Sequence, residues 1–346
     1  MDQWLDCFHA IKVVENPAMG IRTATDTWKQ ALVGLTGTIT TVYRISHFLI
    51  LRRKNIRIVK SFPEKLKRKS TVDKGLAVPN CKEESPVMFA EGTSICCILT
   101  GASQGFGAAI AVDIAKQAVK TKNPTTFILT ARSIEGLDKT KTAVKQIHSS
   151  AKVHCVSADL EDISTISSSL KIIFEKVNPS DFSTALLINN AAKLGDVSKR
   201  IQDFEDPKEL QVMFNLNVTS QFFLMSNFVK TFADVKRYVV NISSLLAIQE
   251  AAGFSLYCAS KAASEMAHRV MAAEEPDVRV LCYAPGPLDT DMNDKILANA
   301  INKEVKDIVK KENVLQPEQS SAQLINLLLE DKFKSGEHID YFDCIK

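Results

Sequence analysis

The chain has 346 residues, of which 45% are hydrophobic and 24% are charged, as in ordinary folded soluble proteins. This length suits one large α/β domain or two smaller domains. The formal net charge of +3 hides an asymmetry, because residues 1–94 hold 15 basic and 9 acidic side chains, whereas residues 95–346 hold 28 and 31. The nearly neutral main part excludes binding of nucleic acid through a basic surface there.

The cysteines carry no metal-binding or disulfide pattern. Several lie in apolar, strand-like runs, where a reduced cysteine behaves as a small hydrophobic side chain. The eight residues are Cys7, Cys81, Cys96, Cys97, Cys155, Cys258, Cys282 and Cys344, with no Cys-x-x-Cys pair among them. We therefore expect a reducing compartment, the cytoplasm, and no structural metal.

Residues 1–94 differ in character from the rest of the chain. The apolar run 31–51 is long enough to cross a bilayer and is followed by basic residues 52–54, but it contains Arg44, His47 and several threonines. An amphipathic helix, a poorly ordered extension and an artefact of gene prediction are the alternatives. The sequence favours a poorly ordered or partly helical extension over membrane contact, and no signal peptide opens the chain.

From Ile95 onward, short apolar runs alternate with segments of helical length. The expected strands are residues 95–100, 126–131, 153–158, 185–190, 237–242, 278–283 and 338–342. Continuous apolar strands that alternate with helices predict a parallel sheet covered on both faces and linked by right-handed crossovers. The fold class is therefore α/β, a Rossmann-like doubly wound sheet of about seven strands. We expect residues 1–94 as an extension and 95–346 as the dinucleotide-binding domain.

The first strand ends in the glycine-rich segment 100–107, TGASQGFG. Gly101, Gly105 and Gly107 follow a predicted strand and precede a predicted helix. In this context glycines let the backbone turn tightly and approach a pyrophosphate at the positive end of the helix. The turn, including Ser103, Gln104 and Phe106, is the expected phosphate-binding site.

A serine, a tyrosine and a lysine are spaced for proton transfer near residue 257. Ser244 lies thirteen residues before Tyr257, and Lys261 lies four residues after it. Positions i and i+4 share one helix face, so the ammonium should lie beside the phenol and lower its pKa. The Ser244 hydroxyl could hold a carbonyl oxygen there. Taken alone, a Tyr-x-x-x-Lys pattern also fits a simple surface pair.

The TGxxxGxG turn and the Ser–Tyr–Lys trio together resemble the short-chain dehydrogenase/reductase family, whose members use NAD or NADP. The resemblance implies roles for further residues, in register over the whole domain. Asn217 would complete the catalytic group through a water molecule. The implied cofactor contacts, besides Tyr257 and Lys261, are Asp159 and Leu160, Asn189, Asn190 and Ala191, Pro285 and Gly286, and Thr290. Ala192 departs from the family's NNAG pattern, where glycine stands.

The choice of dinucleotide should depend on the end of the second strand, where an acidic residue would bind a ribose 2′-hydroxyl. Here Ala131 cannot do so, and Arg132, aided by Ser133, can pair with a 2′-phosphate. The sequence therefore predicts NADPH/NADP+ as the cofactor. Gln104 stands where NADPH-dependent members often have a basic residue, which leaves the strength of the preference open.

Longer segments, including LGDVSK at 194–199 and FKSGEHIDYFD at 333–343, resemble one branch of the family, the sepiapterin reductases. The likeness covers residues 95–346. It implies that Asp340 anchors the amino-pyrimidinone edge of a pterin, since a carboxylate accepts two parallel hydrogen bonds. Phe254 would form an aromatic wall, and Ser244, Tyr257 and Gly286 would contact the substrate.

The resulting hypothesis is an NADPH-dependent reductase of the side-chain ketone of a pterin, in tetrahydrobiopterin biosynthesis. The resemblance also implies a homodimer. The alternatives are a reductase of other carbonyls, such as diketones or quinones, and a non-catalytic dinucleotide-binding scaffold. The catalytic trio does not discriminate between carbonyl substrates, so only Asp340 and the remaining pocket favour a pterin.

Overall fold

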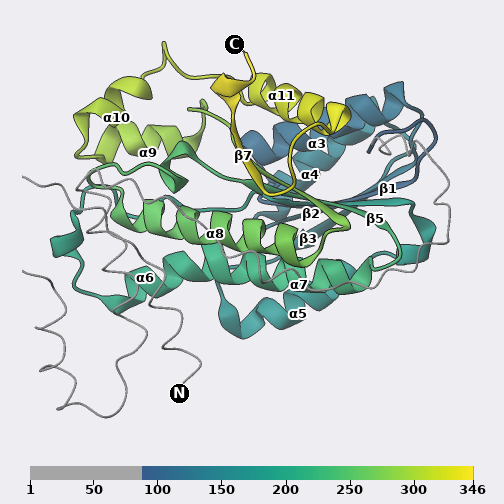
Figure 1. Cartoon of the computed structure of the whole chain (residues 1–346), viewed down its shortest axis with the longest axis horizontal. Helices are drawn as coiled ribbons and strands as arrows, with labels where there is room; N and C mark the ends of the chain where they lie inside the picture. The colour runs from purple at the N-terminus through teal and green to yellow at the C-terminus, as the bar shows by residue number, and fades with distance from the viewer. Residues whose placement is uncertain (1–87, 346) are drawn as a thin grey trace, which may run out of the picture. The chain divides into compact units, whose positions relative to one another are not determined.

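Seven parallel strands form the centre of the structure, a computed structural model that describes residues 88–345 (Figure 1). The predicted sheet is confirmed, and each predicted strand overlaps an observed one. The strands are β1 (Ile95–Thr100), β2 (Thr125–Ala131), β3 (Lys152–Ser157), β4 (Thr184–Asn189), β5 (Lys236–Ile242), β6 (Val278–Ala284) and β7 (Glu337–Asp340).

The strand order β3-β2-β1-β4-β5-β6-β7 makes the sheet doubly wound. The chain runs outward from β1 to β3, then returns to β4 on the other side of β1 and runs outward again to β7. The order reverses between β1 and β4, which pair in parallel from Ile95 opposite Thr184 onward. In open α/β sheets, ligands bind at such a switch point beyond the carboxyl ends of the strands.

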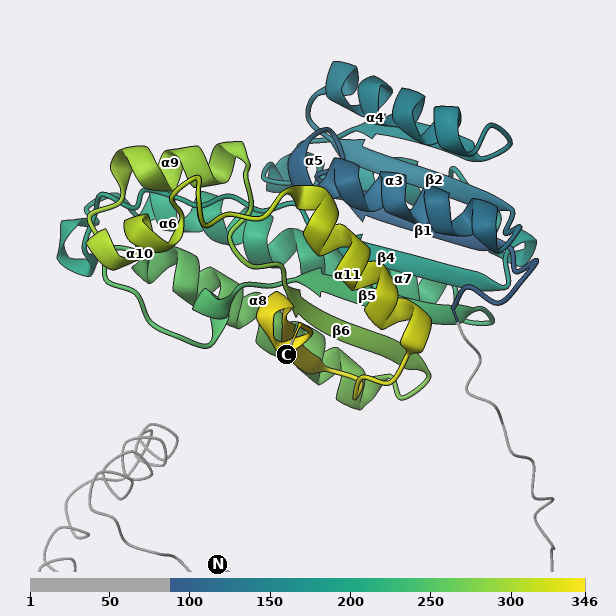
Figure 2. The same cartoon turned by 90° about the horizontal axis from the view of Figure 1, so that it is seen from above.

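Helices cover both faces of the sheet, as Figure 2 shows for the face seen from above. One layer contains α3 (Gly105–Lys120), α4 (Ile134–Ile147) and α11 (Pro317–Glu330). The other contains α5 (Ile163–Phe174), α7 (Ser220–Thr231) and α8 (Ser255–Glu274). Because both faces are covered, every residue of the inner strands β1 and β4 is buried, which explains their unbroken apolar sequences.

Short elements gather near the carboxyl ends of the strands, where α6 (Pro207–Phe214), α9 (Asp291–Asn299) and α10 (Lys303–Ile308) lie on the same side of the molecule (Figure 1). Local side chains fix where helices begin, since Ser133 accepts a hydrogen bond from the Gly136 amide at the start of α4. The remaining short helices are η4 (Pro179–Asp181), η5 (Ile201–Asp203), the π-helical η6 (Asn215–Thr219), η7 (Leu245–Ala247) and η8 (Tyr341–Asp343).

The N-terminal extension that the sequence predicts lies almost entirely outside the described residues. The apolar run 31–51, considered as a membrane segment, and the basic residues 52–54 lie there, and the boundary between extension and domain stays a prediction. Met88 and Phe89 are buried in the main apolar cluster, together with side chains of β1 and α3. Within residues 88–345, no helix has the length and apolarity needed to cross a bilayer.

Candidate active site

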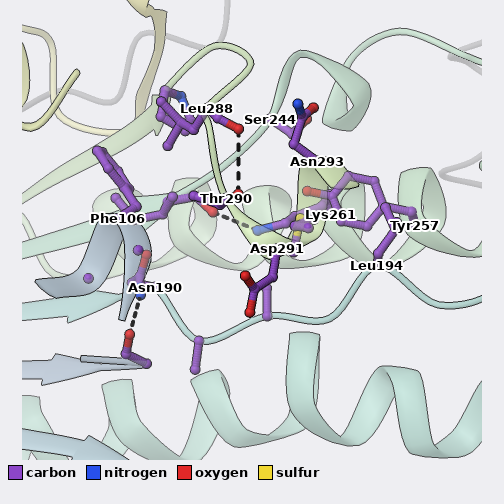
Figure 3. Close-up of a pocket in the computed structure, with 18 of the residues that line it drawn as sticks. Phe106, Asn190, Leu194, Ser244, Tyr257, Lys261, Leu288, Thr290, Asp291 and Asn293 are labelled. Atoms are coloured by element: carbon purple, nitrogen blue, oxygen red, sulfur yellow. Dashed lines mark hydrogen bonds between the residues drawn. The ribbon is translucent and has the colours of Figure 1, made fainter. Parts of the chain in front are cut away.

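A cavity of about 600 Å³ opens at the carboxyl ends of the strands. It brings together all but two of the site residues that the sequence predicts. The predicted residues that line it are Gly101, Ser103, Gln104, Gly105, Phe106, Gly107, Arg132, Ser133, Asp159, Leu160, Asn190, Ala191, Ser244, Phe254, Tyr257, Lys261, Pro285, Gly286, Thr290 and Asp340. Figure 3 shows Ser244, Tyr257 and Lys261 on one side of the cavity and Phe106 and Asn190 on the other.

The glycine turn between β1 and α3 is held by Asn190, which follows β4. The Asn190 side chain donates to the carbonyl oxygens of Thr100 (2.9 Å) and Gly101 (3.1 Å), and its backbone amide donates to the Thr100 hydroxyl (3.0 Å). Gly101 has φ +66°, in the left-handed region that favours glycine. A Cβ at Gly107 would collide with the Gly101 carbonyl oxygen and lie 2.7 Å from the Asn190 amide nitrogen. Positions 101 and 107 therefore have no space for a side chain.

The N-terminal end of helix α3 is suited to binding an anionic ligand. Its N-cap, Gln104, makes no side-chain capping bond, and its first turn has no acidic residue. Amides at a helix N-terminus carry partial positive charge and bind phosphate oxygens. The residues present thus fit the pyrophosphate of a dinucleotide.

The end of β2 offers a free cation to the same cavity. The Arg132 side chain is exposed, and within residues 88–345 it has no carboxylate partner. Ser133 lies beside it but is partly committed, because its hydroxyl caps α4 and donates to Glu135 (3.1 Å). Arg132 is therefore the group available for a ribose phosphate.

The predicted proton-transfer group lies on α8 and just after the end of β5. Tyr257 and Lys261 are one helical turn apart, with the Lys261 Nζ 5.9 Å from the centroid of the Tyr257 ring. Lys261 donates to the carbonyl oxygen of Ile242 (2.7 Å), the last residue of β5. Ser244 is the N-cap of η7, where its hydroxyl accepts from the Leu246 amide (3.2 Å), and this hydroxyl also favours the ionised form of the Tyr257 phenol, so that it opposes the rise of the Tyr257 pKa. The three side chains converge, as the spacing predicts.

The electrostatics of this group differ from the sequence expectation. Burial raises the pKa of Tyr257 to about 12, although the hydrogen bond to Ser244 opposes the rise. Burial also lowers the pKa of Lys261 to about 8, against the attraction of Glu265. The predicted lowering of the phenol pKa is wrong as a net effect, because desolvation of the buried phenol outweighs the interactions that favour the phenolate. The Tyr257 phenol is consequently protonated at neutral pH.

Asn189 and Asn217 are the two predicted residues that do not line the cavity. Asn189 ends β4, and successive strand residues face opposite sides, so Asn190 reaches the glycine turn while Asn189 points to His268 on α8 (2.9 Å). Asn217 lies fully buried in the π-helical turn η6. Its amide oxygen accepts from the Lys193 amide (2.9 Å), and its nitrogen donates to the Lys193 carbonyl and to Ser260 (both 3.0 Å).

Another part of the cavity wall is formed by β7 and the segment after β6. Asp340 ends β7 opposite Ala284, and its Oδ1 accepts from the Phe342 amide (2.9 Å). Among the described residues, its Oδ2 has no hydrogen-bond partner. Phe254 lies 1% exposed at the start of α8. Gly286 has φ +75°, and a Cβ there would lie 3.3 Å from the Phe342 ring.

The structure adds lining residues that the sequence reasoning missed. Phe342 is 46% exposed and forms an edge-to-face pair with Tyr341, 5.3 Å between ring centroids. The position of Phe342, two residues after Asp340, is the sequence feature that could have placed it in the cavity wall. The remaining apolar wall carries no motif and comes largely from α9, α10 and the segments before α8: Leu194, Leu245, Leu246, Leu288, Met292, Ile296, Val305, Ile308 and Val309.

A doubly wound sheet, a glycine turn after its first strand and a buried tyrosine–lysine pair beside the carboxyl end of β5 define the class of short-chain dehydrogenases. The family model described as short chain dehydrogenase matches residues 96–300, so the chain belongs to this family. Sepiapterin reductase of Bos taurus is 39% identical over 255 residues, which cover 71% of this chain and 94% of that protein. The Mus musculus enzyme of the same name is 40% identical over 254 residues, 71% of this chain and 96% of that protein.

A more distant relative is benzil reductase ((S)-benzoin forming) of Bacillus cereus, 31% identical over 253 residues, 70% of this chain and 97% of that protein. Among solved structures, L-sorbose reductase from Gluconobacter frateurii, complexed with NADPH and L-sorbose, has a TM-score of 0.60 and 22% identity, covering 72% of this chain and 95% of that one. This structural match shows the shared fold. The chain is a reductase that uses a nicotinamide dinucleotide and a small-molecule substrate.

Proposed function

We propose that the chain reduces the side-chain ketone of a pterin with NADPH, as in the last reductive step towards tetrahydrobiopterin. One observation carries the proposal: the Asp340 carboxylate lines the same cavity as the proton-donating pair of Ser244 and Tyr257. A carboxylate can accept two parallel hydrogen bonds from an amino-pyrimidinone edge. The sepiapterin reductases among the relatives support this choice of substrate.

NADPH is proposed over NADH because of Arg132. Its guanidinium is exposed on the cavity wall and has no carboxylate partner in the described part of the chain, and no acidic side chain follows it in the pocket before Asp159. A guanidinium pairs with phosphate through two parallel bonds. The glycine turn would hold the pyrophosphate, and Pro285, Gly286 and Thr290 would lie beside the nicotinamide. When bound, the reduced nicotinamide supplies a hydride.

The residues at the reacting carbonyl have separate tasks. The Ser244 hydroxyl donates a hydrogen bond to the carbonyl oxygen and holds it beside the Tyr257 hydroxyl. As the carbonyl carbon gains a hydride, negative charge develops on this oxygen, and Tyr257 donates its proton there to give an alcohol. Lys261, held by the Ile242 carbonyl, places a positive charge behind the phenol and stabilises the phenolate that remains.

Asn217 is proposed as a positioning residue in this scheme. Its amide bonds to both backbone groups of Lys193 and to Ser260, which lies next to Lys261 on α8. It thus joins the segment after β4 to the helix that carries Tyr257. Delivery of protons to Tyr257 through a water molecule held at Asn217 remains a proposal from the family resemblance.

The test compares two substrates with the full chain and NADPH. We expect wild type to reduce sepiapterin, and Asp340→Ala to lower kcat/KM for sepiapterin by about 100-fold while a small diketone changes less than about 3-fold, because only the pterin uses the anchor. Asp294→Ala, at an exposed carboxylate of α9 outside the cavity, is the matched control. Equal loss on both substrates with Asp340→Ala would refute the anchoring role.

Reduction of other carbonyls is the second candidate. The benzil reductase relative and the many aliphatic side chains of the cavity wall, including Leu194, Leu246 and Ile296, favour an apolar diketone. The same catalytic group would serve it, without Asp340. A higher kcat/KM for aromatic diketones than for sepiapterin would favour this alternative.

We also propose a homodimer in a reducing compartment, the cytoplasm. Large apolar side chains stand exposed on α7 and α8: Phe222 (52%), Phe223 (44%), Met266 (53%) and Val270 (44%). Apolar side chains grouped on a surface favour association. The six cysteines of the described residues are all free, which agrees with reducing conditions. Sedimentation of wild type and of Phe223→Lys would test the dimer, which the charge should weaken.

A further inference from the structure

A buried carboxylate joins three elements behind the catalytic group. One oxygen of Glu265 on α8, Oε2, accepts from the Ser243 hydroxyl (2.6 Å) and bonds to Nδ1 of His338 on β7 (2.7 Å). The side chains of Glu265 and His338 are only 3% and 13% exposed. Burial favours the neutral carboxyl, but the bonds from His338 and Ser243 outweigh it and lower the pKa of Glu265. Glu265 is therefore a carboxylate at neutral pH.

Each partner of Glu265 leads to a residue of the proposed active site. His338 lies two residues before Asp340 on β7, so both side chains face the same side of the strand. Ser243 directly precedes Ser244. Lys261 lies one turn before Glu265 on α8, and Glu265 helps to keep it charged. Asp340, Ser244 and Lys261 are thus each connected to the Glu265 carboxylate, either directly or through a neighbouring residue.

Stability of the fold does not by itself explain the contact between Glu265 and His338. Oε1 of Glu265 and Nε2 of His338 are buried and have no hydrogen-bond partner within residues 88–345. Buried polar atoms without partners are costly, and apolar side chains of similar size would often be at least as stable. His338 also lies on a four-residue strand at the edge of the sheet, and within residues 88–345 this strand pairs only with β6. The side-chain contact between His338 and Glu265 therefore fixes β7 against α8, which the pairing of β7 with β6 does not do.

We propose that Glu265 and His338 are positioning residues: their contact fixes β7 against α8 and so sets the distance between Asp340 and the Ser244–Tyr257 pair. This inference rests on the proposed function, because it concerns a substrate bound at both ends. A pterin held by Asp340 must place its ketone at Tyr257, and small misplacements of a reacting group cost large factors in rate. A small diketone, not held at Asp340, is insensitive to this distance.

The first test is a comparison of His338→Val with His338→Asn, using the full chain and NADPH. Valine suits a strand and removes the bond, whereas the asparagine amide can donate to Glu265 as Nδ1 does. We expect His338→Val to lower kcat/KM for sepiapterin by about 10-fold or more, mainly through KM, with less than about 3-fold change for a diketone. His338→Asn should restore most of the loss. Equal losses on both substrates would overturn the inference.

Two further variants separate positioning from folding. Glu265→Met, which removes the acceptor oxygen that glutamine would keep, should reproduce the loss of His338→Val, and the double variant should add little, because both break one contact. Ser335→Ala is the matched control, since Ser335 ties the chain just before β7 to β6 through Val278 and Val280, at the far end from Asp340. It should lower stability without changing the ratio of the two substrates. Additive effects, or a changed ratio in Ser335→Ala, would contradict the proposal.

Hydrogen exchange tests the contact without any substrate. The amides of Ile339 and Asp340 should exchange about 10-fold faster in His338→Val than in wild type, and no faster in His338→Asn. Unchanged exchange in His338→Val would overturn the inference. If exchange responds as expected but wild type does not reduce sepiapterin, the proposed substrate is wrong while the tie between β7 and α8 stands.

Discussion

The side-chain amide of Gln104 donates a 2.8 Å hydrogen bond to the carboxylate of Asp291, joining the glycine turn to the first turn of α9. Both residues line the cavity. The adjacent residues also approach each other, since a Cβ at Gly105 would lie 3.3 Å from the Thr290 methyl group. The segment after β6 is therefore held against the glycine turn. Gln104, unlike a basic residue at this position, is committed to the segment rather than to a ribose phosphate.

Removing this contact should loosen the hold on the cofactor. We expect Gln104→Ala to raise the dissociation rate of NADPH by about 5- to 10-fold, because a hydrogen bond to a charged group contributes about 1.5 kcal/mol or more. Stopped-flow measurement of NADPH fluorescence gives the rate. Gln316→Ala is the matched control, since Gln316 makes the same type of bond to Asp289 (3.2 Å) outside the cavity. Equal rates in wild type and Gln104→Ala would contradict the prediction.

The low pKa of Lys261 predicts how stability depends on pH. The folded value is about 8 and the ordinary value is 10.5. Between these values the unfolded chain binds more protons, so the contribution of Lys261 to the free energy of unfolding rises with pH. From pH 8 to pH 10 the rise should be about 2 kcal/mol. Urea unfolding of wild type and Lys261→Met at both pH values isolates the contribution of Lys261. The difference in free energy of unfolding between the two proteins should change by about 2 kcal/mol from pH 8 to pH 10. A constant difference would contradict the assigned pKa.

The same deprotonation should affect turnover. Loss of the positive charge behind Tyr257 removes the stabilisation of the phenolate, so kcat for carbonyl reduction should fall above about pH 8. Tyr257, whose pKa burial raises to about 12, stays protonated throughout this range. The measurement is kcat with saturating NADPH and carbonyl substrate from pH 6 to 10. A flat profile up to pH 10 would show that the charge of Lys261 is not required.

The role of Arg132 can be tested through the ratio of the two dinucleotides. Arg132→Ala should raise KM for NADPH by about 10-fold or more, because a charge-assisted bidentate contact with phosphate is lost. KM for NADH should stay within about 2-fold, since NADH has no 2′-phosphate. Arg200→Ala, an exposed arginine away from the cavity, controls for a general change of charge. An equal rise for NADPH and NADH would remove Arg132 from phosphate recognition.

The sequence predicts those parts of the site that depend on local spacing. Tyr257 and Lys261 share a helix face because they are four residues apart, and the glycines at 101 and 107 are recognised because they follow a predicted strand and precede a predicted helix. Strand positions follow from unbroken apolar runs, which are buried in β1 and β4. These features need no knowledge of distant contacts.

The sequence does not predict what depends on residues far apart in the chain. The sign of the Tyr257 pKa shift follows from its burial, not from the spacing to Lys261. Asn189 and Asn190 are adjacent and chemically identical, and only the direction of each side chain separates the cavity wall from the core. Glu265 and His338 are 73 residues apart, and the contact between them arises from the place of β7 beside β6.

Tyr257→Phe should lower kcat for carbonyl reduction by at least about 100-fold, because general acid catalysis by a placed side chain contributes factors of this size. NADPH affinity should change little, which a fluorescence titration can check. Tyr238→Phe is the control for removing a buried phenol hydroxyl: Tyr238 donates to Asp331 (2.9 Å) at the amino end of β5, and burial raises its pKa as it does for Tyr257. Loss of the Tyr238 hydroxyl should lower the free energy of unfolding and leave kcat nearly unchanged. Retained turnover in Tyr257→Phe would exclude the tyrosine as the acid and leave Ser244 or a water molecule as the proton source.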